Sequence, residues 1–296
     1  MGLNSKTFVG TGIEGLAHKE STVVLKITCS DTKGLIYQVT KCLYDAGLNI
    51  IRNDEYVDTE TNRFFMRTEF EKKGDITPIR QQLQTMLPDD ANIHFSPDVE
   101  RKIILMAGKE HHCLNDIVNR CDNGDLPAKI QCIISNHEVL LKIAERYDIP
   151  YHYVDHRGKS RKFHETEIHE IVSSYKMDYI VLAKYMRILS SDFVGHYRSR
   201  MINIHHSFLP AFKGARPYLQ AFRRGVKVIG ASAHFVSEDL DEGPIIEQDT
   251  IRVHHGYSPR ELAKAGKDVE KIVLARALDL ICRERVFIHG NKTVVF

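Results

Sequence analysis

The sequence lacks several features that would indicate particular classes of protein. No apolar run approaches the roughly 18 residues that cross a bilayer, so no membrane-spanning segment is expected. The 41 basic and 39 acidic side chains nearly cancel, to a formal charge of +2, and no long block of Lys or Arg is present. A nucleic acid partner is therefore not expected, because binding to phosphate backbones requires a basic surface.

The six cysteines also lack C-x-x-C spacing, so neither a zinc knuckle nor a redox dithiol is indicated. We expect buried free thiols and a cytoplasmic protein, because a reducing compartment keeps isolated thiols unpaired. Residues 1–20 lack the apolar core of a secretory signal, and we expect them to form a tail.

Histidine is plentiful, but its spacing does not favour a metal site. Adjacent histidines diverge on a strand or a helix, and His164 and His169 miss the H-E-x-x-H spacing by one residue. We expect those two side chains on the exposed side of a helix, and we expect no metal and no cofactor. A nicotinamide cofactor is disfavoured because the turn after Ala107 has one glycine where the dinucleotide fingerprint requires three.

The chain is 43% hydrophobic, enough for real cores, and its 296 residues suit one large or two medium domains. In residues 21–97 the periodicity changes in the order strand, helix, strand, strand, helix, strand. Pro78 lies in the first turn of the second helix, and residues 58–62 suit a hairpin loop between the middle strands. This βαββαβ order predicts a ferredoxin-like α+β sandwich.

Two segments of this N-terminal part resemble those of ACT domains, small modules that bind amino acids at subunit interfaces. They are residues 29–36, CSDTKGLI, and residues 45–50, DAGLNI. Asp31 is expected to cap the first helix, and Gly34 lets the backbone approach a neighbour or a ligand. The resemblance implies that residues 21–97 form a regulatory or oligomerisation domain, with an amino-acid effector near Asp31, Gly34 and Asn49 and a homo-oligomer, dimer or tetramer. The alternative is that these are only good turn residues.

After Pro97 the pattern changes to continuous apolar runs separated by amphipathic stretches. Such runs occupy residues 103–106, 128–134 and 179–183. This alternation predicts a C-terminal, doubly wound and mostly parallel α/β sheet over residues 101–296. One of its helices is expected to place Val139 and Tyr147 on the same buried face, and Ser258 is expected to open a long helix that precedes a closing hairpin.

The densest polar cluster lies in residues 201–210 and 233–244. Ligands of parallel sheets bind at the carboxyl ends of strands, and Asn203 and His205, two residues apart, project from the same side of theirs. With Asp241 they supply an amide, an imidazole and a carboxylate, the groups needed to polarise a carbonyl and handle a tetrahedral intermediate. The structural alternative is a turn cap, buried satisfied histidines and an ordinary tight loop.

Three motifs of this part resemble those of folate-dependent formyltransferases: INIHHSFLPAFKGARPY from residue 202, AHFVSEDLDEGPII from residue 233 and KYMRILS from residue 184. With an ACT-like module in front, the whole chain resembles the formyltetrahydrofolate deformylase family. The resemblance implies hydrolysis of 10-formyltetrahydrofolate to tetrahydrofolate and formate. It also implies a supply of formate for purine biosynthesis and a balance of one-carbon folate pools.

Carried over by motif, the expected catalytic residues are Asn203, His205 and Asp241. The residues expected to bind the folate are Met186, Arg187, Ile188, Leu189, Leu240 and Gly243. The roles of four others stay open at this point: His206, His234, Lys213 and Arg216. His234 either supports the site or is satisfied in the core, and the two cations either meet the glutamate tail of a folate or are solvated.

Glycinamide ribonucleotide transformylases hold the acceptor's phosphate on a turn after the first strand. Here that position carries residues 108–112, GKEHH, and Glu110 would place a negative charge beside a phosphate. Water is therefore the expected nucleophile. The first alternative is a folate-dependent formyltransferase acting on a nucleotide or an aminoacyl-tRNA, and the second is a non-catalytic amino-acid sensor.

Overall fold

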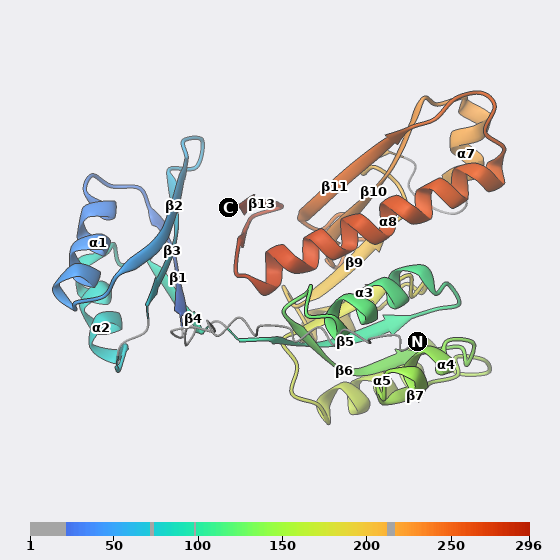
Figure 1. Cartoon of the computed structure of the whole chain (residues 1–296), viewed down its shortest axis with the longest axis horizontal. Coiled ribbons are helices and arrows are strands. Elements are labelled where there is room, and N and C mark those ends of the chain that lie inside the picture. Colours follow the sequence, from blue (N-terminus) through green and yellow to red (C-terminus); the bar gives the residue numbers. More distant parts are fainter. Residues whose placement is uncertain (1–21, 72–73, 98, 212–216) are drawn as a thin grey trace, which may run out of the picture.

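The computed structural model describes residues 22–71, 74–97, 99–211 and 217–296, so the expected tail lies outside the described residues. The N-terminal part comprises β1 (Thr22–Ser30), α1 (Leu35–Asp45), β2 (Ile50–Asp58), β3 (Arg63–Glu71), α2 (Thr77–Met86) and β4 (Asn92–Pro97). Its strands pair in the antiparallel order β2-β3-β1-β4, and both helices lie on one face of the sheet (Figure 1). The predicted ferredoxin-like sandwich is confirmed.

Alternation along β1 and β3 builds the core of this sandwich. Leu25 and Ile27 of β1 and Met66 of β3 are fully buried and pack against α1 and α2. The expected cap by Asp31 is wrong: α1 follows Gly34, whose φ of 96° is left-handed, and no side chain caps the helix. Asp31 instead donates its backbone N–H to the carbonyl of Asn62 in the β2–β3 turn, at 2.9 Å.

The C-terminal part forms a sheet in the order β11-β10-β9-β8-β5-β6-β7. Its elements are β5 (Arg101–Ala107), α3 (His112–Asp122), β6 (Ala128–Ser135), α4 (Leu141–Arg146), β7 (Tyr151–Tyr153), α5 (Arg161–Ser173), β8 (Tyr179–Ala183), α6 (Ser191–His196), β9 (Met201–His205), α7 (Pro217–Arg224), β10 (Val228–Phe235), β11 (Ile245–Arg252) and α8 (Pro259–Cys282). Strands β5 to β9 are parallel, whereas β10 is antiparallel to both neighbours.

Successive residues of β5 are buried on opposite faces of this sheet. Ile103 and Leu105 pack with α3 and α8, whereas Ile104 and Met106 pack with α5 and α6. The doubly wound, mostly parallel sheet predicted from the apolar runs is therefore confirmed. Figure 1 shows α8 lying along β9, β10 and β11, and its start is fixed by a capping box of Ser258 and Glu261.

Two helix predictions fail in this part. Val139 is 64% exposed because α4 begins only at Leu141, so Val139 does not share the buried face of the helix. His164 is buried rather than exposed, and its Nε2 lies 3.1 Å from the carbonyl oxygen of Val154. The reason is helical geometry: residues 164, 168 and 172 are four apart and form the buried stripe of α5.

The chain ends in the predicted hairpin, β12 (Val286–His289) and β13 (Lys292–Val295). The hairpin contacts the face of the small sheet opposite α1 and α2, where Phe65 meets Phe287 edge to face (Figure 1). Glu284, just before it, accepts hydrogen bonds from Lys26 of β1 and Ser96 of β4, each at 3.2 Å. Among the described residues, no helix is both long and apolar enough to cross a membrane.

The sheet reverses its winding at β5, which has β6 on one side and β8 on the other. In open α/β sheets, the crevice at the carboxyl ends of such neighbouring strands is where ligands bind. Gly108 follows β5 and donates its N–H to the carbonyl of Lys184, which follows β8, at 3.1 Å. A Cβ on Gly108 would lie 2.7 Å from that oxygen, so only glycine fits this approach.

Candidate active site

A cavity of about 500 Å³ opens at the carboxyl ends of β8 and β9. Five of the six residues predicted to bind the folate line it, namely Met186, Arg187, Ile188, Leu189 and Leu240, together with Asn203, His205 and Asp241. A more open hollow of about 690 Å³ lies at the other end of the strands, beside Arg101 and Asp178. Ligands of such sheets bind at the carboxyl end, so the smaller cavity is the candidate site.

The wall of this cavity is apolar and accessible. Met186 is 67% exposed, Ile188 57% and Leu240 56%, which is unusual for large apolar side chains that cluster. Such a wall suits a flat aromatic ligand. Gly243 is not part of the lining; a Cβ there would lie 1.8 Å from the carbonyl oxygen of Phe235, so its glycine lets the loop close on β10.

Asn203 is oriented by the neighbouring strand. The register of β9 and β10 places it opposite His234, and its Nδ2 lies 3.2 Å from Nε2 of that ring. Nδ1 of His234 lies 2.8 Å from the carbonyl oxygen of Phe235, so Nδ1 carries the proton and Nε2 accepts from the amide. The buried His234 is thus satisfied and at the same time directs the second amide N–H of Asn203.

His205 meets Asp241, as the predicted chemistry requires. Its Nδ1 lies 3.1 Å from Oδ1 of Asp241, and both side chains are largely buried. Burial raises the pKa of Asp241, but the hydrogen bond and charge of His205 outweigh it and hold this pKa below its usual value. Asp241 therefore stays a carboxylate and accepts a hydrogen bond from the Nδ1–H of His205.

The other ring nitrogen of His205 is left for a reactant. Nε2 is buried and has no hydrogen-bond partner among the described residues, although the ring lines the cavity. A buried polar atom without a partner is costly, so it marks a place where a ligand or water completes the hydrogen bonding. Asn203, His205 and Asp241 therefore converge on one cavity, where the amide of Asn203 offers a donor and Nε2 of His205 offers an acceptor.

The expectation that adjacent histidines diverge is wrong for His205 and His206. Their rings are stacked, with centroids 4.9 Å apart and planes inclined by 14°. The strand β9 ends at His205, so the alternation of side chains does not extend to His206.

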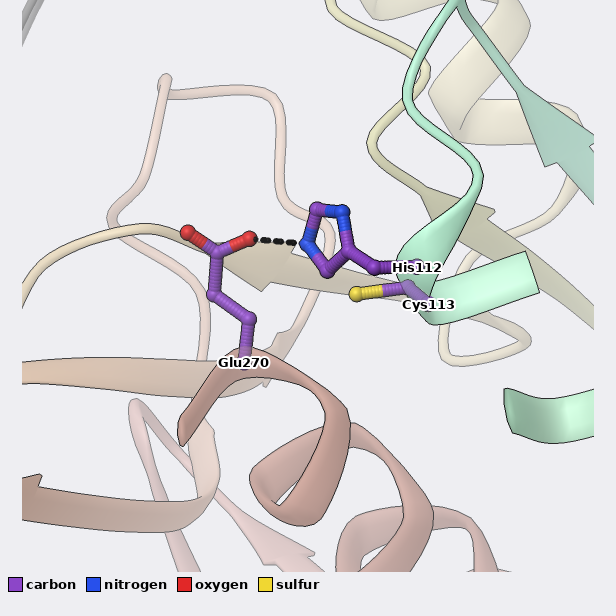
Figure 2. A group of neighbouring side chains, drawn as sticks. All are labelled: His112, Cys113 and Glu270. Carbon is purple, nitrogen blue, oxygen red and sulfur yellow. Dashed lines mark hydrogen bonds and ion pairs between the residues drawn. The ribbon is translucent and has the colours of Figure 1, made fainter. Parts of the chain in front are cut away.

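A second buried polar cluster lies beside the site and was missed by the sequence analysis. Figure 2 shows the carboxylate of Glu270, from α8, directed at the ring of His112 at the start of α3; their Oε2 and Nε2 are 2.7 Å apart. Oε2 of Glu270 also lies 3.2 Å from Nζ of Lys184. The sequence feature that could have indicated this cluster is Glu270 itself, a charged residue on the apolar stripe of a helix, next to Val269 and Val273.

His112, Cys113 and Glu270 bring three potential metal ligands within 4.8 Å of one another (Figure 2). However, the ammonium of Lys184 contacts the same carboxylate oxygen as His112. Burial also raises the pKa of the Cys113 thiol, which disfavours the thiolate that metals bind. The donor set therefore fits an ion-pair network better than a cation site.

The residues predicted for the N-terminal effector lie at the surface. Gly34 and Asn49 are exposed, and the Asn49 side chain donates to Oε1 of Glu71 at 3.0 Å. Asp31 is partly buried in the turn after β1. Lys213 and Arg216 lie outside the described residues.

Comparisons with known proteins agree with this geometry. Residues 101–278 match the Formyl transferase family. A formyltetrahydrofolate deformylase of Escherichia coli (strain K12) is 46% identical over 278 residues, covering 94% of this chain and 99% of that protein. One from Bacillus subtilis (strain 168) is 41% identical over 282 residues, covering 92% and 93%. A crystal structure of a formyltetrahydrofolate deformylase from Pseudomonas syringae pv. tomato has a TM-score of 0.90 at 39% identity, covering 94% and 95%.

Proposed function

The chain belongs to the formyltetrahydrofolate deformylase family, and from this premise we propose that its cavity hydrolyses 10-formyltetrahydrofolate to tetrahydrofolate and formate. The observation that carries the proposal is the convergence of Asn203, His205 and Asp241 on one cavity with an apolar wall. The pterin ring would lie along that wall, with its formyl group toward His205.

In the first step, water attacks the formyl carbon while Nε2 of His205 takes a proton from the attacking water. Asp241, which accepts from Nδ1, keeps the Nε2 lone pair available and stabilises the imidazolium that forms. Because His234 directs the amide of Asn203, one N–H of that amide is free to stabilise the oxyanion together with protonated His205. The imidazolium then gives its proton to the folate nitrogen, the C–N bond breaks, and formate leaves.

The acceptor side of the cleft favours water over an organic amine. Glu110, just before α3, places its Oε2 3.0 Å from Nζ of Lys267 and 3.4 Å from Nδ1 of His112. The cation and the imidazole that an incoming phosphate would need at this helix start therefore already have a carboxylate beside them. Transfer to a phosphorylated acceptor is disfavoured, and the formyl group goes to water.

We propose further that the hydrolysis needs no metal or cofactor, since the amide, imidazole and carboxylate supply the polarisation and proton transfer. We also propose a cytoplasmic role in one-carbon and purine metabolism. Residues 21–97 would serve as an ACT-like regulatory and oligomerisation domain that binds an amino acid near Asp31, Gly34 and Asn49, and residues 101–296 as the catalytic domain. Light scattering would test for a dimer or tetramer, and formate release with and without glycine or methionine would test the effector.

The hydrolysis is tested by measuring formate and tetrahydrofolate from 10-formyltetrahydrofolate with no acceptor added. Equal amounts of both are expected, and added glycinamide ribonucleotide should receive no formyl group. Asn203→Ala should lower turnover by a factor of about 100 to 1,000 because it removes an oxyanion donor. Asn115→Ala, at an exposed position of α3, is the matched control. Formyl transfer without formate release would refute the proposal.

A further inference from the structure

Lys184 is a buried lysine beside the proposed reaction site that the hydrolysis does not use. It follows β8 directly, is 5% exposed, and has a left-handed backbone with φ 62°. Met186 and Asp241 of the same cavity also have positive φ, at 58° and 57°. Non-glycine residues keep such angles only where the surrounding structure imposes them, and they gather at functional sites. The surrounding structure therefore holds Lys184 in an unfavourable backbone conformation.

The ammonium of Lys184 bridges two side chains. Its Nζ lies 3.2 Å from Oε2 of Glu270 and 3.1 Å from Nδ1 of His206. The Glu270 carboxylate also accepts from the Tyr218 hydroxyl at 2.6 Å and meets His112 at 2.7 Å (Figure 2). Burial raises the pKa of Glu270, but these partners outweigh it and lower the value to about 2. Glu270 is therefore ionised and balances the charge of the ammonium.

The contact with Lys184 determines the state of His206. An ammonium has only protons to donate, so Nδ1 of His206 accepts and the ring proton sits on Nε2. Burial and the positive charge of Lys184 lower the pKa of His206 to about 4. The charged and titratable groups that face this ring are Lys184, Glu270, His205, Asp241 and Tyr218. The ring is therefore uncharged at neutral pH.

His206 is in turn the neighbour of the proposed base. Its ring is stacked on His205 with centroids 4.9 Å apart. His205 must take up a proton during the reaction, and a second imidazolium against its face would oppose that proton. An uncharged His206 stays stacked in both protonation states of His205.

We propose that Lys184 is a positioning residue that keeps His206 uncharged and stacked on His205, so that His205 can act as the base. The inference rests on the proposed hydrolysis, but its first test does not require turnover. In Lys184→Met, the His206 ring should titrate about one to two pH units higher than in the unaltered protein, as followed by NMR of labelled histidine. His206→Asn identifies the resonance.

The second test is the pH dependence of formate release. If His206 in Lys184→Met titrates between pH 5 and pH 6, one to two units above its value of about 4, its neutral fraction falls about two- to tenfold between pH 8 and pH 5. The kcat should fall by that factor beyond any fall in the unaltered protein. Lys184→Arg keeps the cation and should restore the original profile. Lys271→Met, which removes a half-buried lysine of α8 paired with Asp268, is the matched control and should leave the profile unchanged.

Three further variants keep the proposal testable. If Lys184→Met does not fold, Lys184→Met with Glu270→Gln replaces the ion pair by uncharged side chains of similar length and should show the same shift. Glu270→Gln alone keeps the ammonium, so His206 should remain largely neutral at pH 5. Combining Lys184→Met with His206→Asn should abolish the additional acid-side loss.

Three results would overturn the proposal. They are a His206 ring that titrates at the same pH in Lys184→Met as in the unaltered protein, an activity loss that is equal at every pH, and an acid-side loss that persists without His206. Absence of formate release from the unaltered protein would instead refute the proposed function, while the NMR titration would still decide the role of Lys184.

Discussion

Replacing Asp241 by Asn isolates the contribution of its charge from that of its shape. Asp241 has φ 57°, and Asn tolerates this left-handed conformation better than Ala does, so the loop should be preserved. The change removes the carboxylate that accepts from Nδ1 of His205 at 3.1 Å. The amide of Asn can instead donate to Nδ1, which places the ring proton on Nε2 and removes the lone pair that the proposed base needs.

The expected loss of kcat is large because the change places His205 in the tautomer that cannot act as a base at Nε2. Replacing a carboxylate that orients a catalytic imidazole by its amide lowers kcat by about 10⁴. That factor corresponds to a loss on the order of 5 kcal/mol of transition-state stabilisation. The apolar wall of the cavity is untouched, so KM should stay within about threefold.

Steady-state formate release from 10-formyltetrahydrofolate, measured as kcat and KM separately, is the assay. Asp239→Asn is the matched control, because it removes an exposed carboxylate two residues away in the same loop. The control should keep full activity. A kcat for Asp241→Asn within about tenfold of the unaltered protein would refute the assignment of Asp241 as the residue that orients His205.

Three other variants test the packing and the buried charges around the proposed catalytic residues and between the two sheets. Gly243→Ala places a Cβ 1.8 Å from the carbonyl oxygen of Phe235 and should lower kcat by about 100-fold by displacing the Asp241 loop; unchanged turnover would contradict this. Glu284→Gln leaves Lys26 and Arg101 without their carboxylate in the buried contact between the sheets and should cost about 3 to 5 kcal/mol of unfolding free energy in urea titrations. The pKa of Glu270 is lowered from 4.5 to about 2, so its stabilisation is complete above pH 4.5 and is lost as pH falls toward 2. Glu270→Gln should therefore reduce the loss of stability between pH 7 and pH 3 by about 2 kcal/mol, and an unchanged acid dependence would refute that account.

Local patterns were sufficient to predict the fold. The βαββαβ order, the apolar runs of the parallel sheet and the start of the long helix at Ser258 are all encoded in short stretches of sequence, and each has the predicted form. The failures come from tertiary packing: the His164 stripe of α5 faces the sheet, and α4 is too short to include Val139.

The candidate site divides in the same way. Strand alternation is enough to place Asn203 and His205 on one side of β9. The polar cluster offered Asp241 as the carboxylate, and the motif resemblance implied its catalytic role. The contact of Lys184 and Glu270 joins residues 86 positions apart in the chain (270 − 184 = 86), one just after β8 and the other in α8. No local pattern relates two such residues, so this contact required the structure.

The most direct measurement of the central claim uses water labelled with ¹⁸O. If water bound beside His205 attacks the formyl carbon, formate released from 10-formyltetrahydrofolate without an acceptor should carry one ¹⁸O per molecule, as read by mass spectrometry. Unlabelled formate, or a formyl group recovered on an amine and not as formate, would contradict the account.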